Sequence, residues 1–569
     1  MRSDINQPEP PVSRSSWIFN SIRPLNAGQI LHDAVAGVQL AAMNIPQALG
    51  YTKIAGTPVV TGFYTLLFPL IAFAAFGSSR YLVVAADSAT AAIMAGGLSV
   101  LALPGTPYYT ELAGMVAMMT AVLLLIARVL RLGFLADFLS QTALVGFLTG
   151  VGFQVSIAVV GGMLGLETVS RRTLSQLMEV ISQLPRVNIP TLLISIAVVV
   201  VIFAMHRLSP KIPGSLLAVA GAVSASVLWN FAGRGIAVIG PVVGGLPHIV
   251  LPHGGWREFE ALVPIAGSCF VMIVAQSAAT ARVYAQRHHQ VLDEDADILG
   301  LAAANTAAAL SGTFVVNGSP TQTEMVESSG GRSQIAQLTT AVCVGAVLLL
   351  LTKPLEYLPR CALDAMVFVI AIRLIDFRAL RAIGRESPGE MWLAILTALV
   401  VVFIGVEQGI ILAMILSLLR VVSHTYHPHT AVLVQDASGV WNLVPAVHGA
   451  ITEPGIIVYR FSATLFYANS EFFSEQVSRL VVPNGPDAHR VHWLVVDAGA
   501  ITHVDYTAAR MLIELHDNLE KEGVRLVLAH VQSDLRPDLD RHHITETIGS
   551  RYIFDTLHEA LAVLRSGAA

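Results

Sequence analysis

Two polar clusters interrupt long apolar stretches of the sequence. The first follows the break Ala85-Ala86-Asp87-Ser88, and the second follows the break Gly318-Ser319-Pro320. Backbone that is not helical survives at membrane depth only where protein or a water-filled cavity covers it. The breaks occupy comparable places in the two halves of the apolar region, so they predict a pair of half-helices that begin near the middle of a membrane.

The first turn of each half-helix offers free backbone N–H groups and the positive end of the helix dipole. Together they attract an anion without a cationic side chain, so the predicted ligand is a small anion. Polar side chains gather at the same places: Ser88, Thr90, Ser319, Thr321, Gln322 and Thr323. They either bind the ligand or bond to a carbonyl of their own helix. The alternative for the breaks is ordinary Gly and Pro kinks.

Two acidic residues lie beside these breaks, Asp87 at the first and Glu324 just after the second. Ionisable residues within membrane segments are costly and are functional candidates. A carboxylate that faces an anion repels it unless protonated, which motivates a hypothesis of proton coupling if these groups are buried. The alternative is that Asp87 caps its half-helix and that Glu324 pairs with a neighbour.

The composition divides the 569-residue chain into unlike parts. It is 54% apolar and only 13% charged, whereas soluble domains are about 25% charged. Apolar stretches continue to about residue 422, and charged residues crowd together afterwards. We therefore expect an N-terminal segment over 1–27, a transmembrane region over 28–422, a linker over 423–445 and a soluble domain over 446–566.

About fourteen membrane segments are predicted from stretches near the 20 residues that a spanning helix needs. The first is expected to break at Asn44-Ile45-Pro46. Most Lys and Arg residues between the segments fall on one side, which places both termini in the cytoplasm of a multi-pass protein of the cell (inner) membrane. The N-terminal segment lacks the apolar core of a cleavable signal and is expected to be retained. The clearest segments are 115–130, 189–205, 216–229, 338–351, 392–404 and 409–419.

The soluble part alternates between two hydrophobic periods. Its pattern is polar and irregular over 424–444, and then predicts strands over 455–461, 493–497 and 525–530. Helical periodicity covers 470–480, 507–522 and 555–564. Strands that alternate with helices indicate a compact α/β domain.

Several function classes are disfavoured. A net charge of −5 gives no basic footprint for nucleic acid. Cys269, Cys343 and Cys361 lack metal-ligand spacing and suggest no disulfide framework. The histidines that invite a metal interpretation lie in connections without an accompanying acidic or cysteine set, so solvent or lipid headgroups are favoured as their neighbours; they are His288, His289, His424, His427 and His429. No nucleophile, base and orienting group recur together, so neither an enzyme nor a cofactor is expected.

Specific motifs over nearly the whole chain resemble the SulP anion permeases, the family of the solute carrier 26 anion exchangers of animals. The first-half motifs are Asp33-Ala34-Val35-Ala36-Gly37, Ile45-Pro46-Gln47-Ala48-Leu49-Gly50-Tyr51, Ala55-Gly56, Gly62-Phe63-Tyr64 and Phe76-Gly77-Ser78-Ser79-Arg80. The second-half motif runs from Asn305 to Asn317-Gly318. The tail is similar to a STAS domain around Asp497 and Asp505-Tyr506-Thr507-Ala508.

The resemblance implies a polytopic α-helical membrane protein of two inverted seven-helix repeats, with a core bundle and a gate bundle, followed by an α/β STAS domain. It also implies elevator-like motion and a homodimer. The substrate-binding residues that it implies are Gln47, Tyr51, Ala86, Asp87, Ser88, Thr321, Gln322 and Thr323.

Two positions depart from the family pattern. Many relatives carry a basic residue where Gln322 stands, so compensation of the anion's charge rests more on the helix dipoles. Sodium-coupled bicarbonate members resemble the chain around Gln276 and Thr280 but use an acid at the position of Gln276. Because a neutral amide is a poor sole anchor for Na⁺, H⁺ coupling or exchange is favoured over Na⁺ coupling.

Thr507 falls where related bacterial regulators carry a phosphorylatable serine at the start of a helix. A phosphate there would gain from the free N–H groups. The alternative is a plain helix-start residue beside an Asp505 cap.

The leading prediction is a secondary active transporter of sulfate, bicarbonate or dicarboxylate, in contact with membrane lipid. A nucleobase-type permease of the same fold is disfavoured by the STAS tail. The other alternative is a membrane-anchored STAS scaffold that binds a cytoplasmic protein and transports little.

Overall fold

The computed structural model describes residues 18–23, 27–131, 140–168, 170, 172–208, 213–241, 244–426, 428–436, 439–482 and 491–566. It divides into two compact units, unit 1 (Met1–Ser417) and unit 2 (Leu418–Ala569). Most of the N-terminal segment predicted over 1–27 lies outside the described residues, as does His427.

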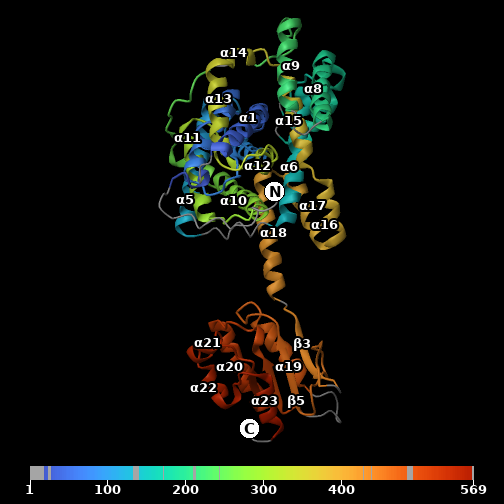
Figure 1. Ribbon diagram of the computed structural model, residues 1–569. Helices are drawn as coiled ribbons and strands as arrows, with labels where there is room; N and C mark the ends of the chain where they lie inside the picture. Colours follow the sequence, from blue (N-terminus) through green and yellow to red (C-terminus); the bar gives the residue numbers. More distant parts are fainter. Residues whose placement is uncertain are drawn as a thin grey trace. The chain divides into compact units, whose positions relative to one another are not determined.

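Unit 1 is built from helices and two very short strands (Figure 1). Its first elements are α1 (Ala27–Ala55), α2 (Val59–Thr65), α3 (Phe68–Phe76), β1 (Val84–Ala85), α4 (Ser88–Leu101), α5 (Pro107–Val129), α6 (Gln141–Met163), α7 (Thr173–Gln183), α8 (Ile189–Leu208) and α9 (Gly214–Trp229). These are followed by α10 (Trp256–Arg287), α11 (Glu294–Leu310), β2 (Asn317–Gly318), α12 (Pro320–Ser328), α13 (Ile335–Leu350), α14 (Thr352–Leu355), α15 (Arg360–Leu374), α16 (Phe377–Glu386), α17 (Pro388–Phe403) and α18 (Val406–Tyr426).

Apolar composition and length make several of these helices able to cross a membrane. Among the described residues, five stretches are long and apolar enough: Val59–Phe76, Pro107–Val129, Gln141–Met163, Ile189–Leu208 and Trp256–Arg287. Shorter apolar helices, including α4, α9, α13 and α17, add to them. The count of about fourteen segments stays a prediction.

The break expected at Asn44-Ile45-Pro46 is wrong, because α1 continues through Pro46. A proline removes one backbone N–H and leaves one carbonyl without its helical partner. Membrane helices tolerate this change because neighbouring groups satisfy the freed carbonyl. Pro46 therefore removes one hydrogen bond from α1 without ending the helix.

The helices of unit 1 form two groups (Figure 1). In the first group, α1 packs on α13, and α5 packs on α10 and α11. In the second group, α6 packs on α15 and α17, and α8 packs on α9 and α15. Contacts of α1 with α15 and α9 join the two groups. The grouping matches the expected division into a core bundle and a gate bundle.

Glycines allow the closest helix contacts of the second group. A Cβ atom added to Gly146 of α6 would lie 2.3 Å from the Ala394 carbonyl oxygen of α17. One added to Gly152 would lie 2.6 Å from the Ala371 carbonyl oxygen of α15. Small residues let membrane helices approach backbone to backbone, where dispersion contacts are dense. The glycines of α6 thus make this helix the packing centre of the second group.

Unit 2 is a five-stranded mixed sheet with helices packed against it. Its strands are β3 (Thr430–Gln435), β4 (Trp441–Pro445), β5 (Ile456–Phe461), β6 (Trp493–Asp497) and β7 (Arg525–Ala529), in the order β4-β3-β5-β6-β7. Its helices after α18 are α19 (Ser470–Val481), α20 (Tyr506–Lys521), α21 (Arg536–Arg541), α22 (Ile544–Ile548) and α23 (Leu557–Arg565). The strands β5, β6 and β7 are parallel, whereas β3 pairs antiparallel with β4 and β5.

The expected α/β character of unit 2 is confirmed, with strand β6 at the predicted bounds. The irregular structure expected over 424–444 is wrong, because β3 and β4 form a hairpin there. Its turn holds Asp436 and Gly439, and Gly439 has a φ of 86°. A glycine at positive φ is a hairpin signal as well as a loop signal, which explains the error.

Candidate functional site

The two predicted half-helices begin from one two-residue ladder. Strands β1 and β2 pair antiparallel, with Val84 opposite Gly318 and Ala85 opposite Asn317. Helix α4 follows β1 after two residues, and helix α12 follows β2 after one. The backbone at both breaks is therefore satisfied by a strand from the other half of the sequence, as burial requires. Both helix N-termini start at this buried ladder.

Asp87 caps α4, since its carboxylate accepts a 3.0 Å hydrogen bond from the Ala89 N–H. The alternative interpretation of Asp87 as a cap thus has direct geometric support. Ser88 and Thr90 are buried in the first turn of α4. The Thr90 hydroxyl donates to the Asp87 carbonyl at 3.4 Å, a local bond of the kind that competes with ligand binding.

Gln322 bridges the two half-helices. Its side-chain nitrogen donates to the Ala86 carbonyl at 3.0 Å. Its side-chain oxygen accepts from the Asn44 amide nitrogen of α1 at 2.9 Å. Gln322 and Asn44 are both buried. The neutral amide at this position therefore joins α1, α12 and the residues before α4.

Thr323 fastens the start of α12 to the strand before α4. Its hydroxyl accepts from the Val83 N–H at 3.0 Å and donates to the Ser319 carbonyl at 2.7 Å. The Ser319 N–H in turn donates to the Val83 carbonyl at 2.9 Å. Thr323 is fully buried, so its role in this structure is to hold the two half-helices together.

Gln47 and Tyr51 lie one turn apart on α1, and the Tyr51 hydroxyl donates to the Gln47 side-chain oxygen at 3.4 Å. Tyr51 is buried and Gln47 partly so. Arg373, near the end of α15, interacts electrostatically with Tyr51. A positive charge from the second helix group thus lies near the predicted site.

Gln276 and Ser277 of α10 support β2. The Asn317 amide nitrogen donates to the Gln276 side-chain oxygen at 2.8 Å, and the Ser277 hydroxyl donates to the Asn317 side-chain oxygen at 2.9 Å. The Thr280 hydroxyl donates to the Gln276 carbonyl within its own helix at 2.7 Å. The bonds of Gln276 and Ser277 to Asn317 thus anchor the second half-helix to α10, as Asn44 anchors it to α1, whereas Thr280 bonds only within α10 in the described residues.

Thr321 and Glu324 lie on the exposed side of α12. The structure therefore does not meet the condition of burial on which a titrating Glu324 depended. The alternative, a Glu324 ion pair with a neighbour, is also not found among the described residues. A nine-residue helix exposes one side, and every third or fourth residue falls on it.

One ion pair crosses between the two helix groups. The Lys53 ammonium of α1 lies 3.2 Å from a carboxylate oxygen of Asp364 on α15. The Asp364 side chain is 3% exposed, whereas that of Lys53 is 47% exposed. The same oxygen of Asp364 has no aligned hydrogen bond, so the contact is electrostatic.

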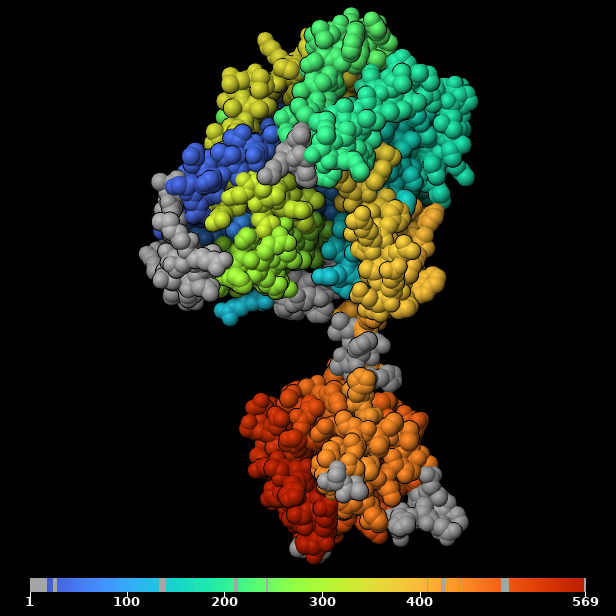
Figure 2. Space-filling view, turned by 45° about the vertical axis from the view of Figure 1, so that its right-hand side comes forward, coloured from blue at the N-terminus to red at the C-terminus, as the bar shows by residue number. Residues whose placement is uncertain are grey.

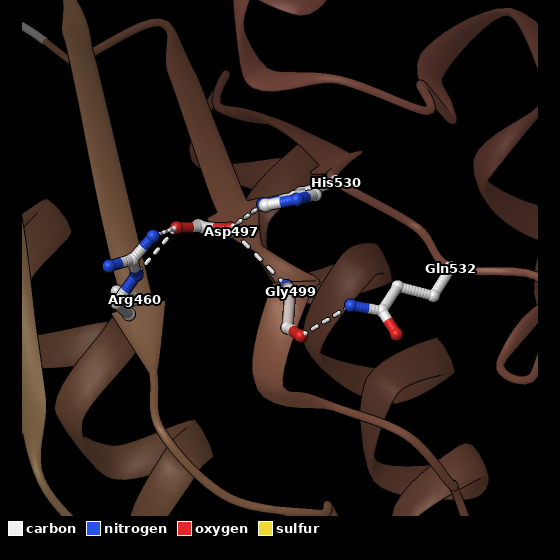
Figure 3. A network of polar contacts seen from close by, with 5 residues as sticks. All are labelled: Arg460, Asp497, Gly499, His530 and Gln532. Carbon is white, nitrogen blue, oxygen red and sulfur yellow. Dashed lines mark hydrogen bonds and ion pairs between the residues drawn. The ribbon is translucent and has the colours of Figure 1, made fainter.

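In unit 2, Asp497 of the expected STAS motif is the last residue of β6, a strand of the parallel part of the sheet. Asp497 is fully buried; its carboxylate accepts from the Arg460 Nε at 2.6 Å and contacts the His530 Nδ1 at 3.2 Å (Figure 3). It also accepts from the Gly499 N–H at 3.2 Å, and Gln532 donates to the Gly499 carbonyl at 3.0 Å. This network joins the ends of β5, β6 and β7.

Thr507 lies exposed in the first turn of α20. Asp505 caps that helix by accepting from the Ala508 N–H at 2.8 Å. The geometry supports the helix-start interpretation of Thr507, while its exposure leaves the hydroxyl accessible.

Asn44, Ser277 and Asn317 are site residues that sequence reasoning missed. All three are buried polar residues within or beside apolar segments, and a buried amide needs partners. That is the signal which could have identified them. Among the described residues, no group of three His, Cys, Asp or Glu side chains is placed to hold a metal ion.

Known proteins resemble the chain along nearly all its length. The Sulfate permease family matches residues 30–397, and the STAS domain matches residues 450–560. A probable sulfate transporter of Mycobacterium tuberculosis is 31% identical over 542 residues, covering 94% of this chain and 95% of the relative. Probable sulfate transporter 4.2 of Arabidopsis thaliana is 26% identical, covering 93% of this chain and 80% of the relative.

Solved structures share the fold. Murine solute carrier 26 family member A9, an anion transporter in the inward-facing state, superposes with a TM-score of 0.88 at 21% identity, covering 97% of this chain and 94% of that one. The transmembrane domain of a cyanobacterial bicarbonate transporter, BicA, gives a TM-score of 0.59 at 19% identity, covering 68% of this chain and 98% of that one. The expected solute carrier 26 fold, a helical transmembrane core with a C-terminal STAS domain, is confirmed, and the chain belongs to the sulfate permease family.

Proposed function

We propose that this chain is a secondary active transporter of small anions. The observation that carries the proposal is the pair of half-helices that start from the buried β1–β2 ladder. Helix N-termini bind anions through free N–H groups and the helix dipole. The names of the relatives favour sulfate, with bicarbonate and dicarboxylates as the other members of the substrate class.

Neutral groups supply most of the proposed anion site. The side chain of Gln322 is bonded to Asn44 and to the Ala86 carbonyl, and its amide still carries a second N–H. Gln47, Tyr51 and the exposed Thr321 hydroxyl complete the proposed contacts. Arg373 adds a positive charge near Tyr51. The negative charge of a bound anion would therefore be compensated by the helix dipoles and by one guanidinium group.

The proposed mechanism is elevator-like, with the group of α1, α5, α10, α11 and α13 carrying the site past the group of α6. The dense hydrogen bonding around the ladder supports movement of the site as one body, because separating the half-helices would leave buried backbone groups unpaired. The Lys53–Asp364 ion pair lies at the seam where the two groups would slide.

Coupling to H⁺ or exchange is proposed over coupling to Na⁺. Gln276 is already occupied by Asn317 and supplies no carboxylate for Na⁺. Asp87 is the proposed proton carrier, in addition to its role as a cap. If Asp87→Asn leaves pH-dependent uptake unchanged, proton transfer through Asp87 is excluded.

We place the protein in the cell (inner) membrane with both termini in the cytoplasm, as a homodimer with a cytoplasmic protein partner at the STAS domain. The Asp505 carboxylate would repel a phosphate on Thr507. Regulation by phosphorylation of Thr507 is therefore a weaker proposal than a plain helix-start role for this residue. Absence of phosphothreonine, together with unchanged transport by Thr507→Ala, would dispose of it.

The deciding experiment is uptake of radiolabelled sulfate, bicarbonate and succinate by proteoliposomes under imposed pH or Na⁺ gradients. Saturable uptake of one anion that a pH gradient drives is the expected result. Thr306→Val is a matched control for site variants, because among the described residues the Thr306 hydroxyl donates only to the Ala302 carbonyl within α11. Uptake of a nucleobase instead would favour the permease alternative, and no saturable flux with retained partner binding would favour the scaffold.

A further inference from the structure

Helix α16 carries a compact basic face. Arg378, Arg381 and Arg385 are spaced by three and four residues, so their side chains share one face of the helix. All three are exposed. Asp376 and Glu386 lie off this face when 3.6 residues make a turn.

The described residues supply no counter-charge to the three arginines. In the part of the chain that the structure describes, no carboxylate forms an ion pair with any of them. The Asp376 carboxylate accepts instead from the backbone N–H groups of Arg378 and Ala379 at the helix start. Three guanidinium groups held on one face and left unpaired suit an anionic partner outside the chain.

The position of α16 in the fold indicates which anion. It directly precedes α17, an apolar helix, so it lies at the end of a span and not within one. Trp392, in the second turn of α17, is 73% exposed, and tryptophan is enriched at the level of the lipid headgroups. Phe377, at the start of α16, is 65% exposed although its ring contacts Phe153. Figure 2 shows the gold-coloured surface of residues around α16 and α17 open on one face of unit 1.

We propose that α16 is an interfacial helix whose Arg378, Arg381 and Arg385 bind the phosphates of anionic phospholipids. Phe377 and Trp392 sit beside the acyl chains, and the guanidinium groups reach the headgroups, as in other amphipathic helices of the membrane interface. The occupant is the lipid leaflet itself. The proposal is independent of which anion the protein transports.

The test measures the lipids that copurify with the full-length protein from membranes of equal phosphatidylglycerol and phosphatidylcholine content. Mass spectrometry gives the ratio of the two lipids retained. Wild type is expected to retain phosphatidylglycerol preferentially. In the variant R378Q/R381Q/R385Q, this preference is expected to fall by a factor of about five for each arginine replaced. That factor corresponds to about 1 kcal/mol for each basic residue near an anionic surface.

Two further variants control for folding and for charge. R378K/R381K/R385K keeps the charge and is expected to keep most of the preference. R186Q/R234Q/R257Q removes three exposed arginines outside α16, from the 3-10 helices Leu184–Arg186 and Ala232–Arg234 and from the first turn of α10, and is expected to match wild type. An unchanged lipid ratio in R378Q/R381Q/R385Q, or an equal loss in R186Q/R234Q/R257Q, would overturn the proposal.

Discussion

The two units stabilise their buried carboxylates by different means. In unit 1, the Asp297 carboxylate accepts from the backbone N–H groups of Ser78 and Ser79, each at 2.8 Å, and from both serine hydroxyls. In unit 2, Asp497 pairs with Arg460 and His530. One carboxylate is held by dipoles, and the other is held largely by side chains that carry or can carry positive charge.

This difference follows from the surroundings of each unit. A cation brought into a membrane-spanning bundle must itself be desolvated, at a cost that often exceeds the gain from pairing. Backbone N–H and hydroxyl groups are already present and carry no net charge. Water near the sheet edge of unit 2 reduces that cost, so charged partners are used there. Unit 1 should therefore be less sensitive to salt and to titration of its partners than unit 2.

The largest expected effect tests the charged network of unit 2. Asp497→Ala leaves Arg460 without its buried partner and should lower the free energy of unfolding of unit 2 by about 3–5 kcal/mol. Hydrogen exchange of the β6 and β7 amides in the full-length protein measures the loss. Glu475→Ala is the control, since it removes only an exposed pair with Arg479, worth about 0.5 kcal/mol. An Asp497→Ala effect as small as the control's would remove the contrast between the units.

Gln322→Leu tests the neutral network of unit 1. It leaves the Ala86 carbonyl and the Asn44 amide unpaired in a buried site, at about 1–3 kcal/mol for each unsatisfied group. We expect kcat/KM for anion uptake to fall by roughly ten-fold or more, independently of salt. Thr306→Val should keep wild-type uptake. If high salt restored anion uptake by Gln322→Leu, charge and not the amide bridge would govern this site.

The buried Asp364 carboxylate of unit 1 differs from that of Asp297, because its partner, Lys53, carries a positive charge. A double-mutant cycle measures how strongly the two residues are coupled. Lys53→Met, Asp364→Asn and the double variant should give a coupling energy of about 1 kcal/mol in thermal unfolding, because Lys53 is half exposed. If the contact between the two helix groups opens during transport, the same variants should also change the turnover rate. Additive effects in both measurements would show that the pair does not couple the two helix groups.

The smallest effect concerns acid stability of unit 2. Burial raises the pKa of Asp538, but hydrogen bonds from the Val504 N–H and from His503 lower it, and the net direction is downward. The stability that this carboxylate contributes is present above its ordinary pKa of about 3.9 and is lost as pH falls through its lowered folded-state pKa. Asp538→Asn should flatten the acid limb of a pH-unfolding profile, whereas exposed Asp534→Asn should not. Identical acid limbs for both variants would contradict this assignment.

Much of the fold could be predicted from the sequence because its signals are local. The alternating run over 493–497 has the bounds of β6, and both breaks before the half-helices could be predicted from the small, polar and proline residues that interrupt the apolar stretches. The hairpin of β3 and β4 was missed because Asp436 and Gly439 signal a loop and a hairpin turn equally. Pro46 misled for a similar reason, since a proline signal does not say whether neighbours will satisfy the freed carbonyl.

The site was harder to predict because its contacts join distant residues. Nothing local to Gln322 indicates that its amide binds Asn44 on α1, since that pairing depends on how α12 lies against α1. Burial of Thr323 and exposure of Thr321 and Glu324 likewise depend on the rotation of one short helix. The residue types at the site could be predicted, but not which of them face one another.

The β1–β2 ladder also has a consequence for how the protein is made. The Gln322 side chain and the Ala86 carbonyl that it binds are separated by 236 positions along the chain. At a synthesis rate of roughly 5–20 residues per second, the first half-helix waits on the order of tens of seconds for its partner. During this time the backbone around Val84 and Ala85 has no strand to pair with. Helper proteins of membrane insertion should therefore recognise the nascent chain most strongly between the synthesis of α4 and that of α12.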